Sequence, residues 1–198
     1  MQSTLNFSCD CGKLRGRVDN VSAKNAARLT CYCKYCLGFA NHLGAGDRFI
    51  RDGGWVNLVQ VAPSAVTIEA GAEHLACLQF TEKGPLRWYA ACCNTPLANT
   101  LSGRMPPFAS FYADTMGAPD LGPVTFHSFC DHLPQADRPQ PNGPAAQRKF
   151  IWRFIKRTIP AILSGRFRKN PFFDAKGAPV AQPTLLTRDQ AKAAFPVR

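Results

Sequence analysis

The sequence predicts a mainly β protein followed by a basic, amphipathic helix. Three features indicate this: short apolar runs separated by turn residues, clustered cysteines, and a sharp rise in positive charge near the end. With 198 residues, the chain is long enough for one full domain and an appendage. We expect a cysteine-rich β domain over residues 1–132, a proline-rich linker over 133–144 and a basic helical extension over 145–198.

Apolar runs that recur about every ten residues predict the β domain. Gly, Pro, Asn or Asp residues separate most of them, as turns between strands require. This spacing favours an antiparallel sheet system. The predicted strands are Leu14–Val18, Trp55–Val61, Ala65–Ile68, Leu75–Phe80, Leu86–Ala90, Phe108–Tyr112 and Val124–Phe129.

The C-terminal part begins with a predicted helix over Ala145–Leu163. At 100° per residue its Phe and Ile side chains fill one arc and its Lys and Arg side chains the opposite arc. Residues 1–144 carry a net charge of +1, and residues 145–198 carry +10. We expect the apolar arc to dock on the β domain and the basic face to be solvated. An anionic membrane surface and a nucleic acid are the alternative partners of this basic tail.

Seven of the nine cysteines fall in three tight clusters. The clusters are Cys9 with Cys11, then Cys31 with Cys33 and Cys36, and finally Cys92 with Cys93. Thiolates at this spacing on tight turns are typical of zinc or iron–sulfur sites. Disulfides are the alternative, but a Cys-x-Cys pair is too close to bridge without strain.

The start of the chain lacks the basic and apolar runs of a secretion signal, and no apolar run reaches the roughly 18–20 residues that span a bilayer. We therefore expect a cytoplasmic, reducing location and zinc as the metal.

Three cysteine-containing motifs follow one another along the chain: Cys9-x-Cys11-Gly12-x-x-x-Gly16-x-Val18, Cys31-x-Cys33-x-x-Cys36 and Arg87-Trp88-Tyr89 … Cys93-Asn94-Thr95-Pro96-Leu97, with Pro123 … His127-Ser128-Phe129 as a weaker later element. In this order they resemble the motifs of the glutathione-dependent formaldehyde-activating enzyme (GFA) family. The resemblance covers roughly residues 5–129. It implies an Mss4-like fold, in which antiparallel β-sheets surround cysteine-rich zinc turns.

The resemblance also implies two zinc sites with different roles. Cys9, Cys11 and the third turn, through Cys93, would hold a structural zinc ion. The middle motif would hold a catalytic zinc ion with three protein ligands, Cys31, Cys33 and Cys36. Three ligands leave a coordination position for a substrate thiol, whereas four close the site. The implied activity is a carbon–sulfur lyase that acts on a small thiol or on an S-hydroxymethyl thiol adduct, with one or two Zn²⁺ ions.

The chain departs from the family pattern at three positions. Ala90 stands where the third turn has its first cysteine, and Cys92 is instead the neighbour of Cys93. We expect Cys92 to be a packed residue or a free thiol. Asn94 replaces the turn glycine, which costs little because Asn tolerates a left-handed conformation. Leu37 stands where the family commonly has an Arg, so a cation that could bind glutathione is missing.

A non-catalytic zinc-binding module of the same fold is therefore the alternative function. In that case the basic tail would bind a partner, a membrane surface or a nucleic acid. Among the remaining candidates, we expect Cys77 to lie in the core and His127 to be a hydrogen-bonded core or rim residue.

Overall fold

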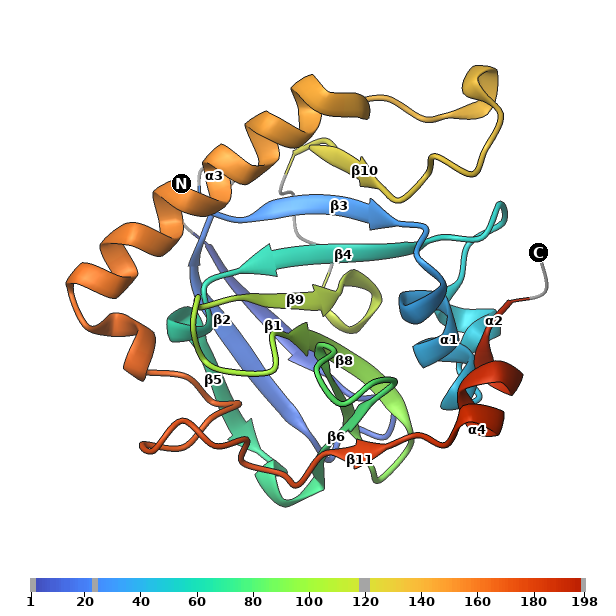
Figure 1. Ribbon diagram of the computed structural model, residues 1–198. Helices are drawn as coiled ribbons and strands as arrows, with labels where there is room; N and C mark the ends of the chain where they lie inside the picture. The colour runs from blue at the N-terminus through green and yellow to red at the C-terminus, as the bar shows by residue number, and fades with distance from the viewer. Residues whose placement is uncertain (1–2, 23–24, 118–121, 197–198) are drawn as a thin grey trace.

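The computed structural model describes residues 3–22, 25–117 and 122–196. Within these residues two sheets pack together, and helices lie around the larger sheet (Figure 1). The smaller sheet has the strand order β1-β2-β5. Its strands are β1 (Ser3–Ser8), β2 (Arg15–Val21) and β5 (Val66–Ala70).

The larger sheet has the strand order β10-β3-β4-β9-β8-β7-β6-β11 within the described residues. These strands are β3 (Ala27–Cys31), β4 (Val56–Val61), β6 (Leu75–Gln79), β7 (Leu86–Ala90), β8 (Thr95–Thr100), β9 (Ala109–Tyr112), β10 (Phe126–Ser128) and β11 (Thr184–Leu185). The inner strands pair antiparallel, as predicted, but both edge strands, β10 and β11, pair parallel with their neighbours. The mainly β prediction is confirmed, and the sheet is mixed.

Side chains alternate along each strand, so the two faces of the larger sheet contact different parts of the molecule. One face packs on the smaller sheet: Val59, Trp88 and Phe111 share a core cluster with Phe7 and Val18. The other face carries Leu58, Gln60, Ser110 and Asn99, and it lies against helices at one end and a cavity at the other.

Three helices lie at one side of the molecule (Figure 1). They are α1 (Lys34–His42), α2 (Gly46–Phe49) and α4 (Arg188–Ala194). Phe39 of α1 and Phe49 of α2 both contact the ring of Tyr112 on the larger sheet. A Cβ atom at Gly38 would come within 2.9 Å of the Phe195 ring, so this glycine allows the segment after α4 to approach α1 closely.

The C-terminal segment that lacks periodicity in the sequence packs on the β domain. Phe172 and Phe173 are buried against Trp88, with ring centroids 5.1 and 6.3 Å away. Further along, β11 adds to the sheet edge at β6, and Phe195 stacks on Phe80 at 5.4 Å. The segment predicted as an extension thus contributes side chains to the same hydrophobic core as the β domain.

Helix α3 (Gly143–Leu163) confirms the predicted C-terminal helix and continues through Pro160. Phe150 stacks on Phe126 of β10, and Phe154 contacts Phe108, so these side chains hold the helix against the β domain. The predicted apolar arc is divided, because Ile159 faces solvent while Thr158 is buried. In the described part of the chain, no helix has the length and hydropathy that crossing a bilayer would require.

Candidate metal centres and an adjoining cavity

The sulfur atoms of Cys31, Cys33 and Cys36 lie within 4.8 Å of one another. We call these residues the pocket cluster. Cys31 ends β3, Cys33 is the N-cap of α1, and Cys36 lies in the first turn of that helix. The N–H of Cys36 donates to the Sγ atom of Cys33 at 3.3 Å, so the thiol takes the place of the usual capping oxygen. This strand-to-helix turn explains why a local sequence motif places three sulfurs together.

A buried arginine contacts the pocket cluster. Arg87, on β7, is only 5% exposed and donates from Nη1 to the Sγ atom of Cys36 at 3.3 Å. Hydrogen bonds from the Cys31 and Cys33 thiols, with the Arg87 charge adding to them, hold the pKa of Cys36 well below its ordinary value. The pKa of Cys31 is raised, chiefly by its hydrogen bonds with the Cys33 and Cys36 thiols and by burial. Negative charge in this cluster therefore concentrates on the Cys36 sulfur.

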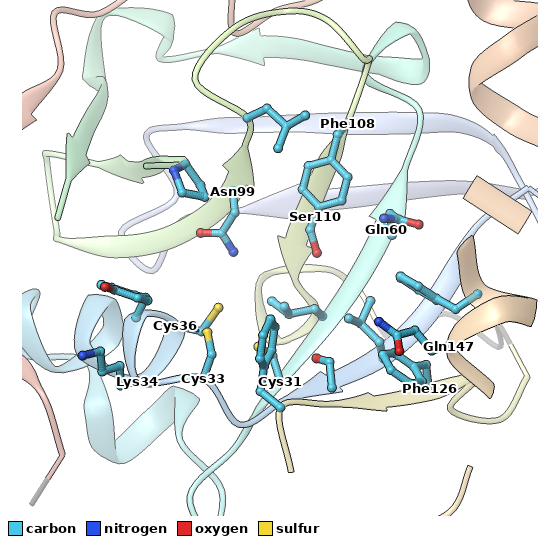
Figure 2. A pocket seen from close by; sticks show the side chains of 18 of the residues that line it. Cys31, Cys33, Lys34, Cys36, Gln60, Asn99, Phe108, Ser110, Phe126 and Gln147 are labelled. Atoms are coloured by element: carbon cyan, nitrogen blue, oxygen red, sulfur yellow. Dashed lines mark hydrogen bonds between the residues drawn. The ribbon is translucent and has the colours of Figure 1, made fainter. Parts of the chain in front are cut away.

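The pocket cluster lies on the wall of a cavity of about 780 Å³ (Figure 2). Most of the lining is apolar and comes from both the larger sheet and α3. The apolar side chains include Leu29, Leu58, Leu101, Phe108, Phe126 and Phe150. A cavity of this size and lining is typical of sites that bind small organic molecules.

The sulfur atoms of Cys9, Cys11, Cys92 and Cys93 form a second group, and they too lie within 4.8 Å of one another. We call these residues the turn cluster. The sulfur–sulfur distances are 3.6 Å for Cys9–Cys11, 3.8 Å for Cys9–Cys92, 3.3 Å for Cys11–Cys92 and 3.9 Å for Cys92–Cys93. Tetrahedral zinc with Zn–S bonds of about 2.3 Å places its sulfurs about 3.8 Å apart. Three of the four distances lie within about 0.2 Å of this value, so the group has the spacing of a zinc site.

Two tight turns bring the turn cluster together. Gly12 has a φ of +74°, and its N–H donates to the carbonyl of Cys9 at 3.0 Å. In the second turn, Asn94 has a φ of +55°, as we expected for the residue that replaces glycine. Ala90 is buried at the end of β7, and the turn that follows directs both Cys92 and Cys93 towards the first turn. Cys92 thus supplies the fourth sulfur, a role that the sequence did not predict.

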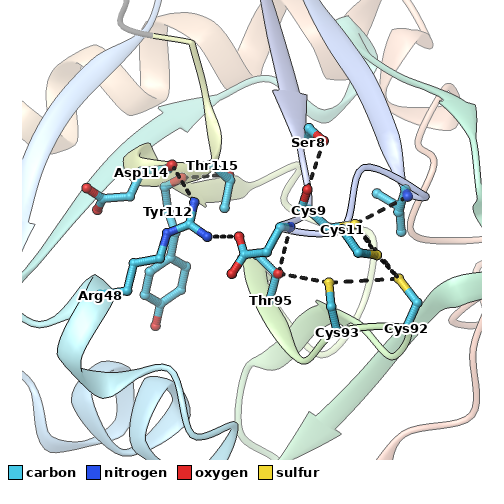
Figure 3. A network of polar contacts seen from close by, with 12 residues as sticks. Ser8, Cys9, Cys11, Arg48, Cys92, Cys93, Thr95, Tyr112, Asp114 and Thr115 are labelled. Carbon is cyan, nitrogen blue, oxygen red and sulfur yellow. Dashed lines mark hydrogen bonds and ion pairs between the residues drawn. The ribbon is translucent and has the colours of Figure 1, made fainter.

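Polar contacts fix the turn cluster to the rest of the fold (Figure 3). The Thr95 hydroxyl accepts from the N–H of Asp10 at 3.0 Å and lies 3.1 Å from the Sγ atom of Cys93. Burial alone would raise the pKa of Cys93, but hydrogen bonds from the Thr95 hydroxyl and the Cys11 backbone lower it to about 6. Arg48, on α2, forms an ion pair with Asp10.

The other residues singled out from the sequence are structural. Cys77 is buried and its thiol donates to the carbonyl of Ala181 at 3.3 Å, as expected for a core residue. His127 is held by the Thr30 hydroxyl at 2.6 Å and the carbonyl of Gln140 at 3.1 Å. This arrangement confirms the prediction of a hydrogen-bonded rim histidine.

The cavity lining also includes His132, which had no predicted role, and Lys34, which could supply the positive charge that is missing at Leu37. His132 lines the cavity, and its Nδ1 atom lies 3.1 Å from the carbonyl oxygen of Phe129. Lys34 also lines the cavity, next to the pocket cluster, whereas Leu37 is buried in α1. No sequence signal marks His132, since the strands that build the cavity around it are distant along the chain.

A search of curated proteins finds no match. A crystal structure of a Rhodobacter sphaeroides protein from a structural-genomics programme matches with a TM-score of 0.42 and 20% identity, over 60% of this chain and 96% of that chain. A TM-score of this size does not establish a shared fold. The model of DUF6151, a family of unknown function, matches residues 1–183, and the chain therefore belongs to that family.

Proposed function

We propose that this protein is a zinc-dependent carbon–sulfur lyase that acts on small thiol adducts and shares the Mss4-like arrangement of the GFA family. The observation that carries the proposal is the position of the pocket cluster. Its three thiols lie within 4.8 Å of one another on the wall of a cavity of about 780 Å³. Three cysteine ligands would leave one position of tetrahedral zinc facing that cavity, where the ion would acidify a thiol and polarise a neighbouring oxygen.

The reaction needs no oxidant or reductant. In an S-hydroxymethyl thiol adduct the carbon–sulfur bond breaks, and its electron pair stays on sulfur. The hydroxyl oxygen becomes the carbonyl oxygen of the released aldehyde. The hydroxyl proton ends on the free thiol, so atoms and charge balance.

Among the residues that line the described cavity, His132 is the one histidine, and a histidine can accept and return this proton. Its Nδ1–H donates to the Phe129 carbonyl at 3.1 Å, and this contact leaves Nε2 as a proton acceptor. Asp131, the preceding residue, lines the same cavity. We assign His132 the role of a general base that takes the hydroxyl proton and returns it to sulfur.

The turn cluster supports a separate, structural zinc ion in this proposal. Its four sulfurs would fill all four tetrahedral positions, so no position would remain for a substrate. An ion held there would tie the turn after β1 to the turn after β7.

The test is the release of formaldehyde from the S-hydroxymethyl adduct of a small thiol by zinc-loaded protein. Cys33→Ser should abolish turnover while the melting temperature stays close to that of the wild type, because Cys33 is only half-buried. Cys77→Ala, which removes a thiol outside both clusters, is the matched control and should keep turnover. If Cys33→Ser releases formaldehyde as fast as the wild type does, the lyase proposal is wrong.

A second candidate function is a zinc module that docks on an anionic membrane through α3. Four apolar side chains of this helix face solvent: Ile151, Trp152, Ile159 and Leu163. Four exposed cations flank them: Arg148, Lys149, Arg153 and Lys156. The exposed apolar stripe favours a lipid surface over a nucleic acid, since phosphate contacts alone would not require it.

A further inference from the structure

Three polar side chains form a row across the middle of the larger sheet. Gln60 on β4 pairs in register with Ser110 on β9, and Ser110 pairs with Asn99 on β8. All three line the cavity, and Figure 2 shows them side by side at its edge. We call Gln60, Ser110 and Asn99 the donor row. They lie on strands separated by up to fifty residues of sequence, so only the fold brings them together.

Two arginines set the orientation of both amides in the donor row. Arg87 donates from Nη1 to Oδ1 of Asn99 at 2.8 Å, and Arg157 of α3 donates from Nη2 to Oε1 of Gln60. A guanidinium group has donors and no acceptor, so the amide atom that faces it must be oxygen. Each amide therefore turns its NH₂ group away from the arginine. In Figure 2 the Asn99 and Gln60 nitrogens point towards the cavity.

The hydroxyl between these amides has no partner. Ser110 is 3% exposed, and its Oγ atom has no hydrogen-bond partner among the described residues. A buried hydroxyl without a partner is unfavourable, and a ligand atom in the cavity would satisfy it. The donor row thus offers one hydroxyl and two amide groups to a single acceptor-rich ligand.

The charge behind the donor row favours an anionic ligand. Arg157 is mostly buried, and it hydrogen-bonds the backbone carbonyls of Asn25 and Gln60 as well as the Gln60 side chain. None of the ion pairs found within the described ranges involves Arg157. Arg87, behind the other amide, contacts the Cys36 sulfur. Both amide groups are thus polarised by cations, and no carboxylate belongs to the row.

We propose that the donor row binds the carboxylate of an amphiphilic ligand whose hydrocarbon part fills the apolar cavity. Two carboxylate oxygens can accept all three donors, and charge on the acceptor strengthens each hydrogen bond. The carboxylate site itself does not depend on the proposed function. The assignment of this carboxylate to the substrate of the pocket cluster does rest on the proposed function. The substrate class is then an apolar thiol or thiol adduct that carries a carboxylate at its far end.

Octanoate is a suitable probe, because it has a carboxylate and a hydrocarbon chain but no thiol. We expect zinc-loaded wild-type protein to bind octanoate saturably in isothermal titration calorimetry. Gln60→Glu keeps the oxygen that Arg157 requires but replaces the NH₂ donor with a second carboxylate oxygen. This variant should bind octanoate at least about tenfold more weakly, and Ser110→Ala should weaken binding in the same direction.

Gln147→Glu is the matched control, since Gln147 lines the same cavity from α3 but lies outside the row. It should bind octanoate like the wild type, and octanol should bind wild type and Gln60→Glu equally. Melting temperatures show whether each variant is folded. Equal octanoate affinity in folded wild type and Gln60→Glu, or no saturable binding by the wild type, overturns the carboxylate site. Octanoate binding without formaldehyde release would overturn only the lyase proposal.

Discussion

The guanidinium of Arg87 lies 3.3 Å from the sulfur of Cys36, and both residues are buried. The same Nη1 atom donates to Asn99, so one side chain links the pocket cluster to the donor row. A buried cation next to a thiolate stabilises the charged form that a metal requires. Arg87 is therefore a positioning residue for both parts of the candidate site.

Arg87→Met should weaken zinc binding at the pocket cluster by about 10–100-fold, as is typical when a partner of a metal ligand is lost. The measurement is a zinc titration against a chromophoric chelator. Arg87→Lys keeps the charge and should recover part of the affinity. Arg104→Met removes a half-buried arginine that donates to the carbonyl of Ala175, outside both clusters, and it should leave both sites unchanged. Unaltered affinity in a folded Arg87→Met variant would show that the contact with Cys36 has no part in metal binding.

Metal content should distinguish the two clusters. We expect purified protein to contain close to two zinc ions per chain, one for each group of cysteines. Cys92→Ala removes the fourth sulfur of the turn cluster and should lower the content towards one, since three remaining thiols hold zinc less tightly. Elemental analysis after dialysis provides the measurement.

Cys77→Ala is the control for Cys92→Ala and should retain the wild-type content, because Cys77 is a core residue outside both clusters. A Cys92→Ala protein that still holds two ions would mean that the turn cluster does not need its fourth sulfur.

The C-terminal segment should contribute strongly to stability. Phe172 is 2% exposed and contacts Trp88 and Phe111 between the sheets. Phe172→Ala should lower the free energy of unfolding by about 3–5 kcal/mol, the usual cost of removing a buried aromatic ring. Phe129→Ala removes the same ring at a position that is 65% exposed, and it should change the free energy by less than about 0.5 kcal/mol. Urea denaturation measures both changes. Equal losses of unfolding free energy in Phe172→Ala and Phe129→Ala would contradict the observed packing of this segment.

Much of the fold could be predicted where burial and turns leave a local pattern. The runs that became β4, β6 and β7 lie within one residue of their predicted bounds. By contrast, β8 was missed, because Pro96 and Asn99 interrupt an apolar pattern in a strand that is buried on both faces. The edge strand β11 has two exposed residues, so only its pairing with β6 defines it.

Part of the candidate site could likewise be predicted from the sequence, and part of it could not. Cys31, Cys33 and Cys36 could be grouped from the sequence because a single strand-to-helix turn holds all three. Cys92 could not be assigned, since its role depends on how the Asn94 turn faces the turn after β1. The donor row was equally hidden, because its residues are neighbours only across paired strands.

The exposed stripe on α3 leads to a prediction about membranes. Leu163 is 82% exposed, and Ile159 lies one helical turn before it. Lys156 lies over the Trp152 ring, 5.4 Å from its centroid, so the apolar and cationic parts of the helix meet at this pair. We expect the protein to float with vesicles that contain anionic phosphatidylserine and to dissociate as salt rises, since both burial and charge attraction contribute.

Ile159→Asp should abolish flotation, because it places a carboxylate in the surface that would enter the lipid. Lys176→Glu reverses an exposed charge outside α3 and should reduce flotation only slightly. Neutral phosphatidylcholine vesicles should recover far less protein than anionic ones. The basic face would instead be a phosphate-binding surface if two results were obtained together. The wild type would fail to float with vesicles, and Ile159→Asp would be retained on a nucleic-acid column as strongly as the wild type. The apolar stripe makes the two outcomes separable, since a lipid surface requires Ile159 and Leu163 whereas a polyanion requires only the cations beside them.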